Sequence, residues 1–120
     1  MLLPPGWVID WYTMPGGERP LQRFLSGLER DETSLADALA LLELLKVRGN
    51  ALRPPRSRSL GEGLFELRAH PRAVRMFYIF RPERRIVVLD GIVKKQDKIP
   101  ADVLNRVRSY QRDAESRPVP

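Results

Sequence analysis

Residues 64–93 read LFELRAHPRAVRMFYIFRPERRIVVLDGIV, and this stretch decides the fold. It contains three runs rich in β-branched and aromatic residues, 64–69, 73–80 and 85–93, which are typical of β-strands. The short proline-containing connections HPR and RPER separate them, so each strand is expected to turn back on its neighbour. The third run is apolar on both faces, as an interior strand is. The stretch therefore predicts an antiparallel meander.

The residues before the meander predict one strand and two helices. In the run 7–13, WVIDWYT, alternation places Val8, Asp10 and Tyr12 on one face and the intervening aromatic and aliphatic residues on the other. Pro20 suits the start of a first helix. A second, leucine-rich helix is expected to be capped by Ser34 and to end at Gly49. Its expected apolar stripe is formed by Leu35, Leu39, Leu42 and Leu45.

The residues after the meander predict a closing helix over 100–113, followed by a flexible tail at 114–120. The Pro/Arg/Ser-rich segment 50–63 is interpreted as a basic loop. The expected fold class is α+β, in the order β-α-α-β-β-β-α. An N-terminal helical hairpin would cover one face of an antiparallel sheet, with the C-terminal helix near the other face or edge. We expect a single domain over 1–120, with its core at about 7–113.

The composition of the chain excludes several kinds of functional site. The chain has no cysteine and one histidine, so it offers no disulfide framework and no thiolate or histidine-rich metal site. We expect no metal and no cofactor. The N-terminus lacks the pattern of a signal peptide, and no apolar run is long enough to span a membrane. The sequence predicts a soluble, cytoplasmic protein with no membrane partner.

The positive charge is concentrated in the middle of the chain. Residues 53–98 carry twelve basic and five acidic groups, net +7, whereas residues 1–52 carry a net charge of −2. Such a footprint favours a phosphate-rich partner or an acidic protein, and the simpler alternative is an ordinary solvated basic surface. Within the basic loop, Arg53, Arg56 and Arg58 are candidate contacts to a nucleic-acid backbone.

The same segment carries the candidate chemistry. Glu66 and Arg68 share one face of a predicted strand, Arg75 lies on its hairpin partner, and Lys94, Lys95 and Lys98 follow the third strand. Cleavage of RNA without metal requires a proton acceptor, a proton donor and cations that hold the phosphoryl oxygens. Arginine matches phosphate geometry, and lysine among other cations can transfer protons.

Each residue also has a purely structural interpretation. Glu66 and Arg68 form a common type of ion pair. Lys94 and Lys95 could protect a strand edge from aggregation. His70 lies in a turn, where a histidine is usually exposed and idle.

Residues 60–110, LGEGLFELRAHPRAVRMFYIFRPERRIVVLDGIVKKQDKIPADVLNRVRSY, resemble the RelE/HigB-type toxin superfamily, especially its phage-derived branch. The ordered motifs ELR, RMFY and KK and the proline-led helix carry the resemblance, which covers roughly 7–113. It implies a RelE-like fold and the toxin of a type II toxin–antitoxin pair. Such toxins are endoribonucleases that cleave mRNA, commonly on the ribosome, and so inhibit translation. Their usual partner is a helix-turn-helix antitoxin, through which alone they would reach operator DNA.

Carried over by motif, the resemblance implies that the catalytic residues are Arg68, Arg75, Lys95, Glu66 and Lys94. Arg68 and Arg75 would bind the scissile phosphate, Lys95 with Lys94 would transfer protons, and Glu66 would orient Arg68 or act as base. Contacts to RNA would come from Arg53, Arg56, Arg58, Arg72 and Lys98. Two alternatives remain: a non-catalytic RNA- or protein-binding module of the same fold, and a phage accessory protein. The only aromatic residue near the C-terminus is Tyr110, which is predicted to be core, and this favours the binding module.

Overall fold

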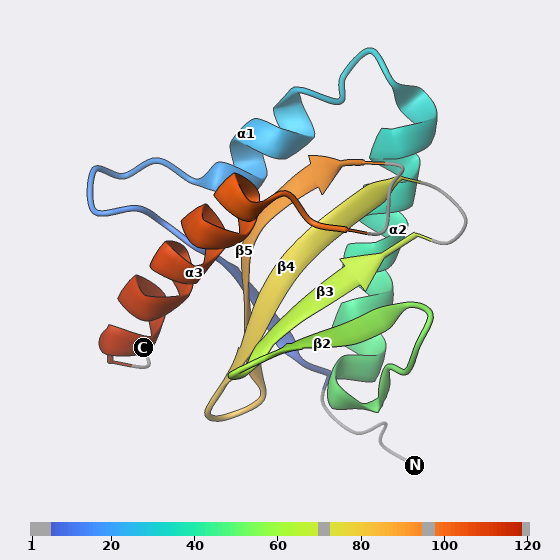
Figure 1. The fold of residues 1–120 in the computed structure, drawn as a ribbon. Helices are drawn as coiled ribbons and strands as arrows, with labels where there is room; N and C mark the ends of the chain where they lie inside the picture. Colours follow the sequence, from blue (N-terminus) through green and yellow to red (C-terminus); the bar gives the residue numbers. More distant parts are fainter. Residues whose placement is uncertain (1–5, 70–72, 95–97, 119–120) are drawn as a thin grey trace.

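The computed structural model describes residues 6–69, 73–94 and 98–118, and in that part the chain forms an α+β fold (Figure 1). The strands are β1 (Val8–Trp11), β2 (Ser57–Gly61), β3 (Leu64–Arg68), β4 (Val74–Arg81) and β5 (Arg85–Val93). The helices are α1 (Pro20–Ser26), α2 (Glu32–Arg48) and α3 (Ala101–Ser116), with a short 3₁₀ turn, η1 (Gly49–Ala51), after α2. The three strands predicted for 64–93 are confirmed to within a residue or two at their ends.

The five strands form one mixed sheet in the order β1-β5-β4-β3-β2. β3, β4 and β5 pair antiparallel as predicted, but β1 pairs parallel to β5, with Val8 opposite Arg85 and Trp11 opposite Val88. The prediction of an antiparallel sheet is therefore wrong at β1. Alternation fixes which face a residue takes, but the direction of pairing depends on how α1 and α2 return the chain to the sheet.

The segment 50–63 is not a loop throughout, because its second half forms β2. This strand pairs antiparallel with β3 and places Arg58 directly opposite Glu66. The two residues between the strands, Glu62 and Gly63, have φ angles of 52° and 81°, as a type I′ hairpin turn requires. The basic character of the segment concealed this hairpin, and Arg58 is a strand residue rather than a loop residue.

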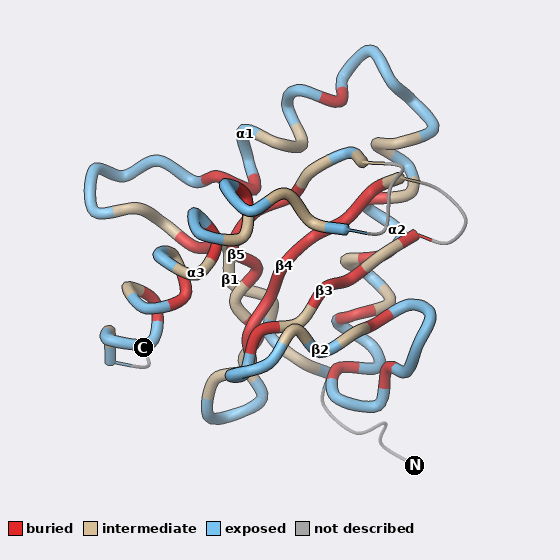
Figure 2. The backbone as a smooth tube through the Cα atoms, viewed as in Figure 1, coloured by how far each residue is buried: buried red, intermediate tan, exposed pale blue. Residues whose placement is uncertain are grey.

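The helices cover opposite faces of the sheet, as predicted for the hairpin. α1 and α2 pack on one face, here called the hairpin face, and α3 packs on the other, here called the α3 face (Figures 1 and 2). Met76 and Tyr78 of β4 belong to the hairpin-face core, whereas Phe77 and Ile79 belong to the α3-face core. The predicted faces of residues 7–13 are confirmed, since Trp7, Ile9 and Trp11 pack on the hairpin face and Tyr12 on the α3 face.

Two details of α2 differ from the prediction. The N-cap is Asp31 rather than Ser34, and the backbone N–H of Ser34 donates a 3.1 Å hydrogen bond to the Asp31 carboxylate. The helix therefore begins earlier. Its buried residues are Ala38, Leu41 and Leu45, whereas Leu39 is 51% exposed. Because α2 has leucines on several faces, its sequence pattern does not decide which face is buried, and tertiary packing does. Gly49 ends the helix as predicted.

α3 is longer than predicted, and the flexible tail is correspondingly shorter. The helix continues to Ser116, and Ala114 is buried against the α3-face core. Arg117 then donates a 2.6 Å hydrogen bond from Nη1 to the carbonyl oxygen of Thr13. The end of α3 is thereby attached to the segment after β1, and of the predicted tail only 119–120 lie outside the described residues.

Candidate functional site

Two of the predicted arginines are direct neighbours on the α3 face of the sheet. Arg68 of β3 lies opposite Arg75 of β4 in the antiparallel register. Glu66 lies two residues before Arg68 on the same strand, so its side chain points to the same face. This face is that of Phe77, which pairs with Glu66 and belongs to the α3-face core. The structure thus brings together three residues that the sequence selected separately.

Glu66 is the centre of a buried cluster of charges. Its carboxylate is fully buried, and its two oxygens face two different arginines. Oε1 lies 3.2 Å from Nη2 of Arg58, and Oε2 accepts a hydrogen bond of 3.4 Å from Nη1 of Arg75. Arg75 is itself buried, whereas Arg58 remains partly exposed on the edge strand β2. Among the described residues, the cluster holds one carboxylate and the guanidinium groups of Arg58, Arg68 and Arg75.

This geometry favours a positioning role for Glu66 over direct contact with a substrate. A fully buried carboxylate that is paired with two guanidinium groups cannot easily approach the hydroxyl group of a substrate. Removing one partner of a buried ion pair is strongly unfavourable, so the carboxylate contributes to holding Arg75 in place. Arg58 was predicted only as an RNA contact, and the structure adds it to the cluster. The cross-strand pair of Arg58 and Glu66 could be found only once β2 was recognised as a strand.

The register of β5 places one lysine beside this cluster. Ile92 lies opposite Arg75, and Val93 lies opposite Val74, which packs on the hairpin face. The backbone N–H of Lys94 donates a 2.8 Å hydrogen bond to the carbonyl oxygen of Ala73, so the ladder continues past the end of the strand. By alternation, Lys94 returns to the α3 face, the face of Arg75. β1 pairs with β5 only as far as Val88, so the end of β5 beside Lys94 has a strand on one side only, and the interpretation of its lysines as guards of a sheet edge stays open.

The other predicted residues divide into two groups. Lys95, Arg72 and His70 lie outside the described residues. Arg53, Arg56 and Lys98 are exposed, and Arg53 donates from Nη1 to the carbonyl oxygens of Asn50 and Leu52. The carbonyl oxygen of Arg56 accepts a 2.9 Å hydrogen bond from the backbone N–H of Arg68, so Arg56 lies next to the cluster in the sheet. The role of the three exposed residues as RNA contacts stays a prediction.

One comparison with known proteins identifies the family of the chain. The family described as Phage derived protein Gp49-like (DUF891) matches residues 23–111. The chain belongs to this family. The Gp49-like family is generally associated with toxin–antitoxin ribonucleases. No curated protein matches the chain.

A second charged pair in this Gp49-like chain was not predicted. Asp90 of β5 is buried, and its Oδ2 lies 3.1 Å from Nε of Arg106 on α3. The register of β4 and β5 shifts between Phe77 and Tyr78, so that Phe77 pairs with Asp90 and Tyr78 with Val88. This β-bulge turns Asp90 from the hairpin face, where strict alternation from Val88 would place it, to the α3 face. In the sequence, the signal for this buried pair was a carboxylate beside a glycine within the apolar run RIVVLDGIV.

Burial raises the pKa of the Asp90 carboxyl above its ordinary value, and the backbone N–H of Gly91 and the charge of Arg106 oppose this rise. The carboxylate lines a hollow of about 450 Å³ between α1, β5 and α3. Phe24 of α1 and Tyr110 of α3 also line the hollow, and Arg23 joins Arg106 beside it.

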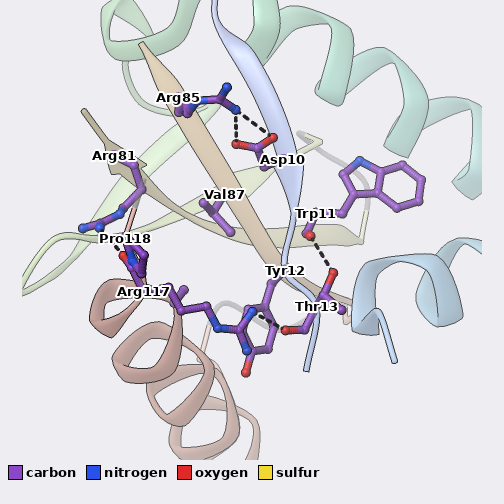
Figure 3. A pocket seen from close by; sticks show the side chains of 10 residues that line it. Asp10, Trp11, Tyr12, Thr13, Arg81, Arg85, Val87, Arg117 and Pro118 are labelled. Carbon is purple, nitrogen blue, oxygen red and sulfur yellow. Dashed lines mark hydrogen bonds and ion pairs between the residues drawn. The ribbon is translucent and has the colours of Figure 1, made fainter. Parts of the chain in front are cut away.

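A separate hollow of about 310 Å³ lies between β1, the paired ends of β4 and β5, and the C-terminal end of α3 (Figure 3). Its arginines are engaged within the chain. Both carboxylate oxygens of Asp10 accept hydrogen bonds from Arg85, at 3.2 and 3.0 Å, and Arg81 donates to the carbonyl oxygen of Arg117 at 3.1 Å. The guanidinium of Arg117 lies 5.2 Å from the ring of Tyr12. The pair of Asp10 and Arg85 joins β1 to β5, and the contacts of Arg117 attach the end of α3 to the sheet. We assign this hollow a structural role.

Among residues 6–69, 73–94 and 98–118, no group of three or more histidine, aspartate or glutamate side chains is placed to hold a metal ion. No helix in the same part of the chain has the length and apolar character needed to cross a membrane.

Proposed function

We propose that this Gp49-like chain is the toxin of a type II toxin–antitoxin pair with a RelE-like fold, and that it inhibits translation by cleaving mRNA without a metal ion. The observation that carries this proposal is the pairing of Arg68 with Arg75, beside a carboxylate that is already neutralised by Arg58 and Arg75. Two neighbouring guanidinium groups match the geometry of an RNA phosphate. The association of the family with toxin–antitoxin ribonucleases supports the same conclusion.

In the proposed reaction, the 2′-oxygen of one nucleotide attacks the adjacent phosphorus and loses its proton. The bond from phosphorus to the 5′-oxygen of the next nucleotide breaks, and that oxygen takes up a proton. The products are a 2′,3′-cyclic phosphate and a free 5′-hydroxyl. Arg68 and Arg75 bind the non-bridging oxygens and stabilise the charge that grows on them in the transition state.

The proton transfers fall to the lysines. Arginine retains its proton under all ordinary conditions, whereas the ammonium of lysine can give its proton up. Lys94, on the face of Arg75, protonates the leaving 5′-oxygen or adds charge beside it, and Lys95 is the second candidate for this step. The lysine that is not the donor accepts, in its neutral form, the proton of the 2′-hydroxyl. Glu66 holds Arg75 and Arg58 in position, because a buried carboxylate fixes the guanidinium groups that it binds.

The partners follow from the same proposal. The substrate is mRNA, bound to the ribosome, and the exposed Arg53, Arg56 and Lys98 contact its backbone or that of ribosomal RNA. A helix-turn-helix antitoxin neutralises the toxin and connects it to operator DNA.

The decisive experiment expresses the wild-type chain and the Arg68→Ala/Arg75→Ala variant from a tightly controlled promoter. The wild type should arrest growth and produce new mRNA 5′ ends within coding regions, and the variant should do neither. The matched control is Arg30→Ala/Arg48→Ala, which removes two exposed arginines from the region of α2 and should behave as wild type. Equal growth and equal mRNA decay for the wild type and the first variant would overturn the proposal.

The burial of Glu66 favours one alternative. If no described carboxylate can reach the substrate and the lysines do not transfer protons, the cluster would bind RNA without cutting it. Ribosomes that retain the chain in a salt-sensitive manner, with intact message, would support this binding module. An adjacent helix-turn-helix gene argues for the toxin, whereas adjacent head or tail genes argue for a phage accessory protein.

A further inference from the structure

The hollow that contains Asp90 lies close to the arginine cluster. Asp90 and Ile92 are two residues apart on β5, and Ile92 lies directly opposite Arg75. Two residues of a strand span about 6.8 Å, and neighbouring strands lie about 4.8 Å apart, so the backbones of Asp90 and Arg75 are less than about 10 Å apart. The β-bulge places both side chains on the α3 face. A nucleotide next to the scissile phosphate could therefore reach the hollow.

The walls of the hollow are suited to a flat ring. Phe24 comes from α1, which packs on the hairpin face, and Tyr110 comes from α3 on the other face. Both rings are partly exposed within the hollow. Phe24 lies directly against the backbone of Gly91, where any side chain would overlap the ring atoms. β1 pairs with β5 only as far as Val88, so β1 does not cover the outer edge of β5 beyond that residue.

The charges at the hollow distinguish between possible occupants. Its floor carries the carboxylate of Asp90, which in its ionised form only accepts hydrogen bonds. Its mouth carries Arg106, which is partly exposed, and Arg23, which pairs with Glu18 on the surface. A basic peptide would meet two arginines, and an acidic peptide would meet a buried carboxylate. A nucleotide avoids both conflicts, because its phosphate is anionic and its base can donate N–H groups.

Among the bases, guanine matches this floor best. Its Watson–Crick edge presents N1–H and the N2 amino group side by side, and a carboxylate can accept from both. Oδ1 of Asp90 accepts one hydrogen bond, from the N–H of Gly91, and Oδ2 lies against Arg106. A carboxylate has about four acceptor positions, so about two remain. Adenine offers only one N–H group on that edge, and uracil offers one N–H between two acceptors that a carboxylate repels.

We propose that this hollow is a guanine subsite, in which Phe24 and Tyr110 contact the base, Asp90 accepts from N1–H and N2–H, and Arg23 and Arg106 attract the phosphate. The subsite rests on the proposed function in one respect, namely that the guanine belongs to the cleaved message next to the scissile bond. Binding of a free guanine nucleotide to the hollow does not depend on cleavage.

The first test leaves the protein unchanged and varies the ligand. The wild-type chain, carrying ¹⁵N and ¹³C, is titrated with GMP, IMP, AMP and UMP while the ring resonances of Phe24 and Tyr110 are followed by NMR. GMP should bind of the order of tenfold more tightly than AMP or UMP. IMP, which lacks the N2 amino group, should lie between them. Equal affinities for the four nucleotides, or no shift of these rings, would overturn the proposal.

The second test uses Asp90→Asn, with Arg30→Ala as the control. The variant should lose the preference for GMP over AMP to within about twofold, and the control should keep it. If Asp90→Asn does not fold, Phe24→Leu takes its place, and it should weaken all four nucleotides together. A preference for GMP that survives in a folded Asp90→Asn variant would contradict the role of the carboxylate.

Mapping of cleavage sites separates this proposal from the proposed function. Cleavage with guanine enriched at one fixed position beside the cut, and with that enrichment lost in Asp90→Asn, supports both. Cleavage without such enrichment, together with no preference for GMP, overturns the subsite alone. Binding of GMP without any cleavage overturns the proposed function and leaves the subsite. Protection of the Phe24 and Tyr110 rings by a co-purified protein partner, with no effect of nucleotides, would show a protein-docking surface and contradict the proposal.

Discussion

Arg68 and Arg75 are direct cross-strand partners on β3 and β4, and their side chains leave the sheet on the same face. Like charges placed opposite each other normally destabilise a sheet. The carboxylate of Glu66 compensates for part of this repulsion, through its contact with Arg75. An anion held between Arg68 and Arg75 should compensate for more of it, and should thereby stabilise the fold as well as occupy the site.

We expect inorganic phosphate and short RNA to raise the melting temperature of the wild-type chain. A ligand at ten times its dissociation constant stabilises the folded state by about 1.4 kcal/mol. The Arg68→Ala/Arg75→Ala variant should lose most of this increase, whereas Arg30→Ala/Arg48→Ala should retain it. The measurement is thermal unfolding at constant ionic strength, with chloride in place of phosphate. Equal stabilisation of all three proteins would mean that the anion binds elsewhere.

Removal of the charge on Glu66 should lower the stability of the fold. Glu66→Gln removes the carboxylate that pairs with the buried guanidinium of Arg75, and breaking such a buried pair costs about 3–5 kcal/mol. A second substitution, Arg75→Met, should recover part of that loss, because it removes the other charge of the pair. Urea unfolding of the two single variants and the double variant gives the coupling energy. Additive losses would show that the two side chains do not act as a pair.

The sequence predicted what depends on local pattern. Alternation in the run 64–93 predicted three strands and the shared face of Glu66 and Arg68, since a period of two fixes the side of each residue. The aromatic residues around Ile9 were assigned to the correct face for the same reason.

Features that depend on distant parts of the chain were missed. β1 joins the sheet beside β5 and parallel to it, and nothing in either run specifies that partner. Arg58 meets Glu66 because β2 pairs with β3 in one particular register. Asp90 reaches the α3 face only because of the β-bulge after Val88. A sequence that shows the faces of single strands does not show their neighbours or their irregularities.

The register of β5 predicts different roles for Lys94 and Lys98. Lys94→Ala should reduce the single-turnover rate of RNA cleavage by about 10²–10⁴-fold, the usual contribution of a proton-transferring group. Lys98→Ala removes an exposed side chain and should change the rate by less than about threefold while weakening the salt-dependent binding of RNA. Lys94→Arg separates the roles, because arginine keeps the charge but does not release its proton. A fully active Lys94→Arg variant would limit Lys94 to an electrostatic role.

Ionisation of Tyr12 should lower the stability of the folded chain at high pH. Its hydroxyl donates a 2.6 Å hydrogen bond to Asp113, and burial together with this bond raises the pKa of Tyr12 to about 12. The unfolded chain, whose tyrosines keep the ordinary pKa of about 10, binds fewer protons between those values. Stability is therefore unaffected by this group below about pH 10 and decreases as pH rises toward about 12.

The measurement is urea unfolding at several pH values from 8 to about 11.5, with Tyr12→Phe as the comparison. The variant loses a hydrogen bond to a charged acceptor and should be less stable at pH 8 by about 1.5–3 kcal/mol. The difference between the two proteins should shrink as the pH rises. A constant difference over the whole range would mean that Tyr12 does not titrate in the expected window.

Gly91 and Phe24 should show a compensating pair of substitutions. A methyl group at Gly91 would overlap the ring of Phe24, because the ring packs on the bare backbone of β5. Gly91→Ala should therefore destabilise the chain by about 1–3 kcal/mol, as overpacking does. Phe24→Ala alone should also destabilise it, because the partly buried ring is lost from the hairpin-face core. The double variant should be less destabilised than the sum of the two single variants, because the smaller side chain makes room for the methyl group.

Gly16→Ala, at a position with open space around it, is the matched control and should change stability by less than about 0.5 kcal/mol. If the losses of the two single variants simply add, the ring does not lie against Gly91 in solution, and one wall of the hollow beside Asp90 is placed wrongly.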